Sequence, residues 1–390
     1  MKRFLALVLC LFICIVFPVQ AEENTDENIM EHLNLSAPSA LLMESSTGQI
    51  IYEKDANTKR PPASVTKIMT MLLIFDAIES GKINLEDEVT TSEYAASMGG
   101  SQVFLEPGEI QTVDTLLKCI AVASANDACV AMAEYICGTE TEFVSQMNKR
   151  AEELGMENTH FENCNGLDAE GHLTTARDIA LMSRELILKH PEIRDYCMIW
   201  QENIIHTTPK GSAEFGLSNT NKLVRHYEYA TGLKTGSTSQ AKFCISATAE
   251  KNDIELIAVI MAADNSKLRN KDATSLLSYG FSKCNLYKED SIIEIEPVKV
   301  IKGEKDFVKA AQKEAFLYVD IMGNNLNEIE RKVEFNKINA PIRTGNKIGI
   351  VHYYLNDKEI GNVDIIATET VNELSYIGAL QNLIEQFFVL

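Results

Sequence analysis

Strand patterns lie at both ends of the first 284 residues of this chain, and helical patterns lie between them. Residues 39–56 and residues 241–263 each read as two apolar, β-branched runs with a turn between them. Residues 112–138 instead carry apolar side chains at helical spacing, interrupted at Ser124-Ala125-Asn126. Strands from both ends with helices between them predict one sheet closed by the chain ends, an α+β domain spanning 38–284.

The composition changes after this domain to alternating strand patterns such as KIGIVHYYLNDKEIGNVDIIA, with a hairpin turn at Asn356–Asp357. Residues 285–370 are therefore predicted to form a small all-β domain. Residues 371–390 place apolar side chains on one side of a helix and polar side chains on the other. This amphipathic helix could pack on its own domain, but we expect it to lie on a membrane surface.

The N-terminus has the pattern of a secretory signal. Lys2 and Arg3 precede an apolar run that is short for a membrane span, and the run is followed by the small-residue exit Val19-Gln20-Ala21. We expect residues 1–21 to be a signal peptide and residues 22–37 to be an acidic, disordered lead-in. The chain is thus predicted to work outside the cytoplasm, at the outer face of the cytoplasmic membrane.

The net charge and the cysteines restrict the partners of the chain. A formal charge of −20 argues against nucleic acid, which requires a basic surface. Seven of the nine cysteines follow the signal peptide, and they show no zinc-like spacing. We expect most of them to be buried as small apolar residues, Cys129 and Cys137 on one helix and Cys244 in a strand.

Ser64 and Lys67 lie three residues apart at the start of a predicted helix. Pro61 and Pro62 precede it, and apolar residues recur at helical spacing as far as Gly81. In the first turn of a helix, free N–H groups favour developing negative charge. Taken alone, the pair equally fits a serine that caps the helix and a lysine that reaches solvent.

Two further motifs give the pair a chemical meaning. Ser124-Ala125-Asn126 lies at the break between two helices, where a turn can direct a hydroxyl and an amide into a cleft. Lys234-Thr235-Gly236 opens a strand, where the lysine offers a cation and Gly236 permits close backbone approach. Each pattern alone is common in turns, but this ordered trio is far rarer by chance. His160, His172 and His206 form no comparable cluster, and we expect them to be surface or packing residues.

With these motifs the chain resembles the low-molecular-weight penicillin-binding D-alanyl-D-alanine carboxypeptidases, which are active-site serine D,D-peptidases. The resemblance runs from about Pro38 to Cys284 and includes GSQVFLEPGEIQTVDTLL and NGLDAEGHLTTARDIALMSREL. It implies a β-lactamase-like catalytic domain, in which helices surround an antiparallel sheet, followed by the β domain and the anchor.

The resemblance also implies a role for each motif residue. Ser64 would be the acylated nucleophile, Lys67 the general base, and Ser124 a proton relay. The substrate-binding residues would be Asn126 for the peptide backbone, Lys234 and Thr235 for the terminal carboxylate, Gly236 for close approach, and the N–H groups of Ser64 and Ser237 for the oxyanion. Asp168, Arg177 and Asp178 would form a salt-bridged loop at the cleft rim.

The implied reaction removes the terminal D-alanine from peptidoglycan pentapeptide stems, with β-lactam antibiotics as inhibitors and with no metal or cofactor. Three alternatives stay open from the sequence: a D,D-endopeptidase, a class A-like β-lactamase and an inactive envelope scaffold. A β-lactamase would need a glutamate that activates the deacylating water, and Glu170 is the one glutamate in NGLDAEGHL.

Overall fold

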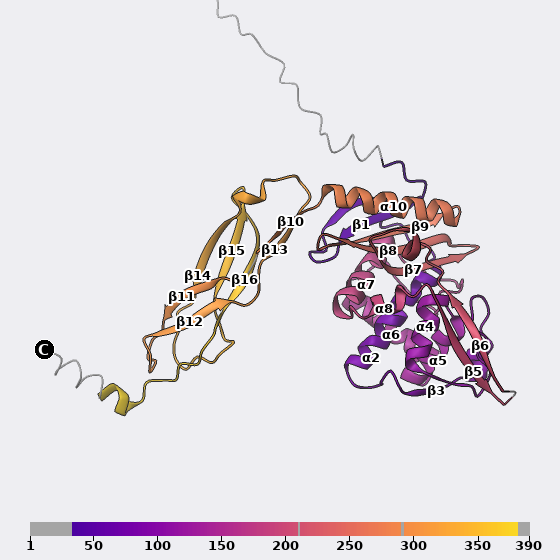
Figure 1. Cartoon of the computed structure of the whole chain (residues 1–390), viewed down its shortest axis with the longest axis horizontal. Helices are drawn as coiled ribbons and strands as arrows, with labels where there is room; N and C mark the ends of the chain where they lie inside the picture. Colours follow the sequence, from indigo (N-terminus) through magenta and orange to yellow (C-terminus); the bar gives the residue numbers. More distant parts are fainter. Residues whose placement is uncertain (1–32, 210, 290–291, 381–390) are drawn as a thin grey trace, which may run out of the picture. The chain divides into compact units, whose positions relative to one another are not determined.

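The structure is a computed structural model that describes residues 33–209, 211–289 and 292–380 (Figure 1). Within these ranges, residues 36–283 form a sheet covered by helices, and residues 285–373 form a smaller unit built of strands. The predicted fold class, an α+β domain followed by a small all-β domain, is therefore confirmed.

A five-stranded antiparallel sheet forms the centre of residues 36–283, in the order β2-β1-β9-β8-β7. The strands are β1 (Ser39–Glu44), β2 (Ile50–Lys54), β7 (Ala230–Thr238), β8 (Lys242–Lys251) and β9 (Ile254–Ala263). The early strands pair with the late ones, since Leu41 of β1 lies opposite Val259 of β9. Strand β9 is almost entirely buried, as expected for a central strand with both faces covered.

Helices cover both faces of this sheet. Helix α10 (Ser266–Lys283) packs on one face and α7 (Ala176–Lys189) on the other, and most other helices lie on the α7 side (Figure 1). The remaining helical segments are η1 (Ala63–Thr66), α2 (Lys67–Glu79), α3 (Glu93–Ala96), α4 (Val113–Lys118), the π-helical turn η2 (Cys119–Ala123), α5 (Asn126–Cys137), α6 (Glu140–Glu153), α8 (Ile193–Cys197) and α9 (Leu223–His226). Two further antiparallel pairs join β3 (Glu88–Thr90) to β4 (Ile110–Thr112) and β5 (Gln201–Thr208) to β6 (Gly211–Ser218).

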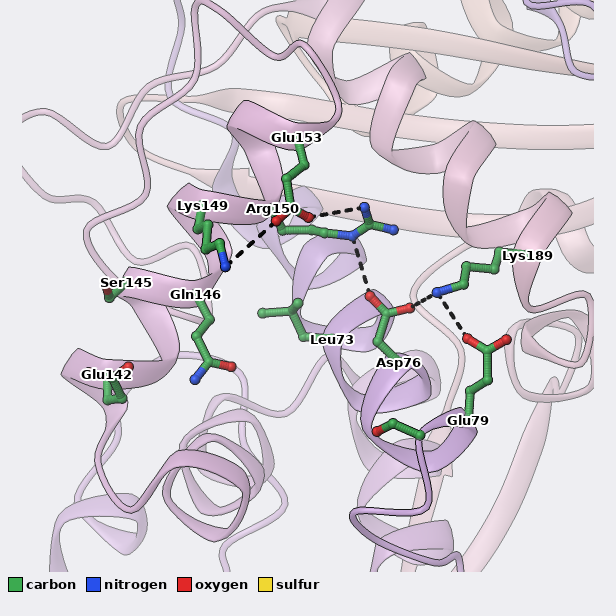
Figure 2. Close-up of a pocket in the computed structure, with 11 residues that line it drawn as sticks. Leu73, Asp76, Glu79, Glu142, Ser145, Gln146, Lys149, Arg150, Glu153 and Lys189 are labelled. Atoms are coloured by element: carbon green, nitrogen blue, oxygen red, sulfur yellow. Dashed lines mark hydrogen bonds and ion pairs between the residues drawn. The ribbon is translucent and has the colours of Figure 1, made fainter.

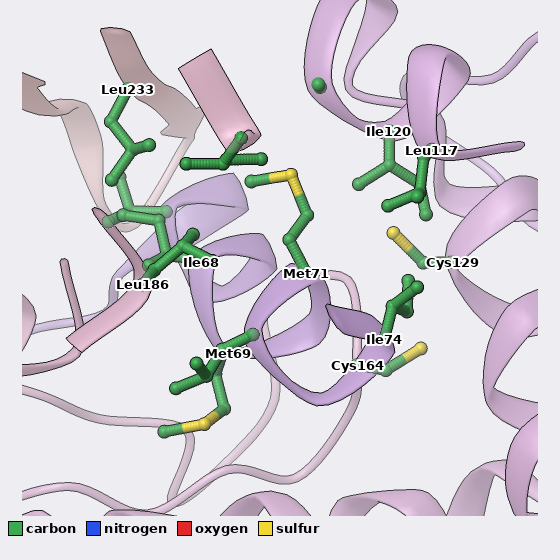
Figure 3. Close-up of a cluster of buried hydrophobic side chains, with 14 of the residues drawn as sticks. Ile68, Met69, Met71, Ile74, Leu117, Ile120, Cys129, Cys164, Leu186 and Leu233 are labelled. Carbon is green, nitrogen blue, oxygen red and sulfur yellow. The ribbon is translucent and has the colours of Figure 1, made fainter. Parts of the chain in front are cut away.

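Helix α2 runs through the centre of the core and is buried on nearly every side. Its apolar side chains from Ile68 to Phe75 are at most 2% exposed, except for the partly buried Leu73. Figure 3 shows α2 among side chains from other elements, including Leu117, Ile120, Cys129, Leu186 and Leu233. A helix that is apolar all round belongs in a protein interior. Lys67, its first residue, therefore has no surface to reach.

The second unit is a five-stranded antiparallel sheet in the order β11-β12-β16-β15-β14, with a separate β10–β13 pair. Asn356 and Asp357 both adopt positive φ, 51° and 61°, as a tight hairpin turn requires. Tyr353 is fully buried and stacks on Phe316 at 3.7 Å. The elements are β10 (Asn285–Lys288), β11 (Glu294–Lys299), β12 (Phe307–Gln312), β13 (Leu317–Asp320), η3 (Leu326–Glu328), β14 (Glu330–Phe335), β15 (Lys347–Leu355) and β16 (Lys358–Ala367).

The structure corrects two predicted boundaries. The lead-in was expected to be disordered as far as residue 37, but Ser36 Oγ and Ala37 N both donate to Asp272 Oδ2 at 2.8 Å. The terminal helix was expected from residue 371, but Val371 and Glu373 still form β-bridges, and helical residues begin at 376. The predicted signal peptide and residues 381–390 lie outside the described residues. Among the residues that are described, no helix has the length and apolar character needed to cross a membrane.

The cysteines follow the sequence prediction. All seven that follow the predicted signal peptide are free thiols, and each is buried except the partly buried Cys137. Cys129 and Cys137 share α5, and Cys244 lies in β8. Burial raises the pKa of Cys129 and Cys197 to about 12, so these thiols stay protonated and unreactive.

Truncating a central α2 side chain should destabilise the protein strongly. Ile74→Ala removes three carbons from a fully buried position, so we expect a loss of about 2–5 kcal/mol in the free energy of unfolding. The matched control is Ile205→Ala, since Ile205 is 58% exposed, and its cost should stay within about 0.5 kcal/mol. Urea unfolding followed by circular dichroism measures both, and equal losses would contradict the central place of α2.

Candidate active site

Ser64 lies in the tight turn η1 that leads directly into α2. Ala63 adopts a positive φ of 49°, which is uncommon for a residue with a side chain and redirects the chain just before the serine. The carbonyl of Ala63 packs against Gly166, where an added Cβ would lie 1.9 Å from that oxygen. The turn is therefore held in an unusual conformation from outside, and Ser64 is left partly exposed at its surface.

Lys67 is fully buried beside this serine. Its Nζ lies 3.0 Å from Ser64 Oγ, 2.7 Å from Asn126 Oδ1 and 2.6 Å from Asn165 O. A neutral amine has two N–H donors and one lone pair. Two carbonyl oxygens take the two donors, so the lone pair is left to face the serine hydroxyl. The interpretation in which Lys67 extends to solvent is wrong, because the side chain is 0% exposed.

Burial also favours the neutral form of this lysine. Desolvation lowers the pKa of Lys67 from its ordinary 10.5, against smaller opposing effects from the nearby Cys129, Cys164 and Asp127. Lys234 is buried as well, and desolvation together with the charge of Lys67 lowers its pKa to about 7. Two ammonium groups in one dry site repel each other, so the pair holds fewer than two protons near neutral pH.

Ser124 and Asn126 lie at the predicted break between two helices, and this break brings both residues to the site. The π-helical turn η2 ends at Ser124, which has left-handed φ and ψ of 63° and 34°, and α5 begins at Asn126. Asn126 Nδ2 donates one N–H to Gly99 O at 2.7 Å. Its side-chain oxygen Oδ1 accepts from Lys67. The second N–H of Nδ2 has no acceptor among the described residues.

Strand β7 forms the facing wall and carries Lys234, Thr235, Gly236 and Ser237. A Cβ at Gly236 would lie 2.7 Å from Ser64 N, so only glycine lets the strand approach the nucleophile turn this closely. Thr235 Oγ1 donates to Thr220 Oγ1 at 2.8 Å. Lys234 Nζ lies 3.3 Å from Thr235 O, and no ion pair of Lys234 occurs in the described part of the chain.

These walls enclose a cavity of about 200 Å³. Five of the eight predicted site residues line it: Ser64, Ser124, Thr235, Gly236 and Ser237. Lys67, Asn126 and Lys234 are each at most 3% exposed and lie behind the lining. The structure thus brings together all three motifs, which are separated by up to 170 residues in the sequence.

Arg269 on α10 is a site residue that the sequence analysis missed. It lines the cavity, is only 5% exposed, and donates to Asn270 Oδ1 at 3.0 Å and to Cys244 O at 3.5 Å. No carboxylate pairs with it within the described ranges, and burial lowers its pKa to about 10. Its spacing on α10 was a usable signal, because Arg269 falls on the same buried face as Ala273, Leu276 and Leu277.

The predicted salt-bridged loop of Asp168, Arg177 and Asp178 is wrong, because the three side chains have separate partners. Asp168 accepts from Thr238 Oγ1 at 2.6 Å, at the end of β7. Arg177 pairs with Glu53 instead. Asp178 accepts from Thr159 Oγ1 at 2.7 Å.

A second cavity, of about 680 Å³, lies between α2 and α6 (Figure 2). Asp76 and Glu79 there, with the nearby His190, place three possible metal-ligand atoms within 4.8 Å of one another. Lys189 Nζ already binds both carboxylates, at 2.7 Å and 2.9 Å, as Figure 2 shows. Arg150 Nε also lies 3.3 Å from Asp76 Oδ2, so two cationic side chains balance the two carboxylates. This cavity offers no nucleophile comparable to Ser64.

Comparison with known proteins agrees with this geometry. Residues 25–265 match the family described as D-alanyl-D-alanine carboxypeptidase, and residues 281–373 match the C-terminal domain of penicillin-binding protein 5. The chain is 40% identical to the D-alanyl-D-alanine carboxypeptidase DacF of Bacillus subtilis, covering 98% of this chain and 97% of that protein. It is 31% identical to DacC of Escherichia coli, over 93% and 91% of the two chains.

The fold is similar to that of penicillin-binding protein 5 from Haemophilus influenzae, with a TM-score of 0.72 and 30% identity over 87% of this chain and 98% of that one. These matches confirm the activity class predicted from the sequence, a serine-type carboxypeptidase that binds penicillin. The chain belongs to the D-alanyl-D-alanine carboxypeptidase family.

Proposed function

We propose that this protein removes the terminal D-alanine from peptidoglycan stem peptides through an acyl-enzyme on Ser64. The observation that carries the proposal is the position of Lys67. Its Nζ is fully buried, lies 3.0 Å from Ser64 Oγ, and has two carbonyl acceptors for its two remaining N–H groups. This arrangement presents a base to a nucleophile before any substrate binds.

In the acylation step, Ser64 Oγ attacks the carbonyl carbon between the last two D-alanines and transfers its proton to Lys67 Nζ. The N–H groups of Ser64 and Ser237 stabilise the oxyanion, which the close approach at Gly236 supports. The carbon–nitrogen bond then breaks, and the proton passes from Lys67 through Ser124 to the leaving amine. Water hydrolyses the ester in the same way, with Lys67 accepting its proton and Ser64 regaining one.

The terminal carboxylate of the substrate binds on the β7 side of the cavity. The family resemblance implies this role for Lys234 and Thr235, and Arg269 supplies a further buried cation that lines the cavity. Asn126 binds the substrate backbone on the opposite side, where it has one N–H left to donate. Within the described residues neither Lys234 nor Arg269 has a partner carboxylate, and in a chain of charge −20 such cations fit an anionic substrate.

The geometry argues against the β-lactamase alternative. Glu170 is exposed and does not line the cavity, so it is not placed to activate a deacylating water. The nucleophile, its base and the cations are all in position, which argues equally against an inactive scaffold. The endopeptidase alternative uses the same chemistry and differs only in the leaving group.

We also propose that residues 1–21 direct export, that residues 38–284 are the catalytic domain, and that the chain end associates with the outer face of the cytoplasmic membrane. In support, the three apolar residues Tyr376, Ile377 and Leu380 are 87%, 70% and 52% exposed. A membrane surface would bury these side chains.

Exchanging each lysine for arginine should separate their roles. Lys67→Arg keeps the charge but cannot act as a base, because guanidinium stays protonated, so D-alanine release should fall by a factor on the order of 10³. Lys234→Arg still presents a cation and should retain part of the activity. The measurement is D-alanine released from a pentapeptide mimic, with Ser64→Ala as the inactive control. An active Lys67→Arg enzyme would rule out Lys67 as the base.

The pH dependence should follow from the two lysines. Activity requires neutral Lys67 and charged Lys234, so kcat/KM should rise as Lys67 loses its proton and fall as Lys234 loses its own. The charge of Lys67 contributes to lowering the pKa of Lys234 to about 7, so with Lys67 neutral the falling limb of kcat/KM should lie above pH 7 but below the ordinary lysine pKa of 10.5. Bound substrate carboxylate raises that pKa, so the falling limb of kcat should lie at higher pH. Lys234→Arg should remove the falling limb, and its persistence would contradict the assignment.

Removing the chain end should release the protein from membranes without loss of activity. Residues 371 and 373 still pair with the β domain, so the cut belongs before Tyr376. The mature chain truncated after Ser375 should be recovered in the soluble fraction with unchanged D-alanine release. If the uncut mature chain is also fully soluble at low salt, the membrane proposal fails.

A further inference from the structure

Residues 161–173, here called the rim segment after the place that the family resemblance gives them, pack directly on the nucleophile turn and the start of α2. Lys67 Nζ donates to Asn165 O at 2.6 Å, and Thr70 Oγ1 donates to Cys164 O at 2.5 Å. Gly166 lies against the carbonyl of Ala63, with no room for a Cβ. The rim segment therefore holds the conformation of the turn that carries Ser64.

One side chain connects both ends of the rim segment to that turn. His172 is 2% exposed, and its Nδ1 accepts from the backbone N–H of Glu162 at 2.9 Å. Because a backbone N–H can only donate, Nδ1 carries no proton, and the neutral ring must carry its proton on Nε2. That Nε2 lies 2.8 Å from Thr66 Oγ1, so His172 donates to Thr66. Thr66 lies between Ser64 and Lys67 in the sequence and is itself fully buried.

We propose that His172 is a positioning residue of the active site, whose neutral imidazole joins the rim segment to Thr66 and so fixes the distance between Ser64 and Lys67. This inference rests on the proposed roles of Ser64 and Lys67, and it replaces the prediction that His172 is a surface or packing residue. His172 contacts neither the substrate nor the reacting atoms. It acts through the single hydrogen bond to Thr66, and its ring is held by the edge-on contact with Phe161 at 5.8 Å.

The surroundings of His172 favour the neutral imidazole that donates to Thr66. Burial, with smaller effects from the charges of His160 and Lys67, lowers its pKa to about 4, while Asp168 acts in the opposite direction. A second proton would have to sit on Nδ1, facing the N–H of Glu162, where two donors would oppose each other. The imidazole is therefore a fixed donor rather than a proton carrier, unlike a histidine that serves as a general base.

The test is a double-mutant cycle between His172 and Thr66, with the second-order rate constant for acylation by a fluorescent penicillin as the readout. His172→Asn retains an acceptor near Nδ1 but cannot reach Thr66, and Thr66→Val removes the hydroxyl at nearly constant volume. Each should slow acylation by a factor on the order of 10 to 100, since small displacements of reacting groups have effects of that size. The double variant should be no slower than the slower single variant, because both changes remove one contact.

Conservative variants and stability separate positioning from simple support of the fold. His172→Gln can place an N–H near the Nε2 position, so it should regain most of the rate. The control is His160→Asn. His160 directly precedes the rim segment, its side chain is 59% exposed, and this variant should be acylated at the wild-type rate. Thermal unfolding of every variant is measured alongside, and rates are expressed per folded enzyme. If His172→Asn does not fold, Thr66→Val with His172→Gln carries the same test.

Two results would overturn the inference. One is a wild-type acylation rate in folded His172→Asn, whatever its loss of stability. The other is a multiplicative effect in the double variant, which would mean that His172 and Thr66 act independently. Failure of the proposed function looks different, because in that case the wild-type protein itself would not be labelled at Ser64.

Discussion

Burial of a lysine beside a serine is the interaction on which this active site depends. Lys67 begins a helix that the core surrounds, so its ammonium form would lose its hydration without gaining a carboxylate partner from the part of the chain that the structure describes. The protein supplies carbonyl oxygens from Asn126 and Asn165 instead, and these stabilise an amine with two N–H groups. The same burial that would be costly for a charged lysine thus produces a neutral base at the serine.

Each neighbouring element contributes to that arrangement. The break between η2 and α5 brings Asn126 to Lys67, and the rim segment brings Asn165. Strand β7 closes the site because Gly236 lets it approach the Ser64 backbone, and it brings Lys234 into the same dry environment. The charge of one buried lysine then favours loss of a proton from the pair. The catalytic unit is therefore a property of the packed domain and not of the Ser-x-x-Lys motif alone.

The sequence predicted those parts of the structure that depend on local pattern. The pairing of early and late strands, the helix break at Ser124 and the eight predicted site residues follow from periodicity, turn chemistry and family resemblance. Contacts that depend on tertiary packing did not follow. Asn165 contributes a backbone carbonyl, which any residue could supply, and the histidine pattern gave no indication that His172 would reach Thr66. Asp168, Arg177 and Asp178 were grouped in one loop through the family resemblance, whereas the fold gives each a different partner.

The protonation state of Lys67 can be measured directly by nitrogen-15 NMR of the lysine Nζ atoms across a pH titration. The Lys67→Arg and Lys234→Arg variants assign the two signals. The account predicts that the Lys67 signal titrates well below the ordinary lysine pKa of 10.5. The proposed roles of the two lysines also require Lys67 to become neutral while Lys234 is still charged. A Lys67 signal that stays that of an ammonium group up to pH 10.5 would contradict the central claim.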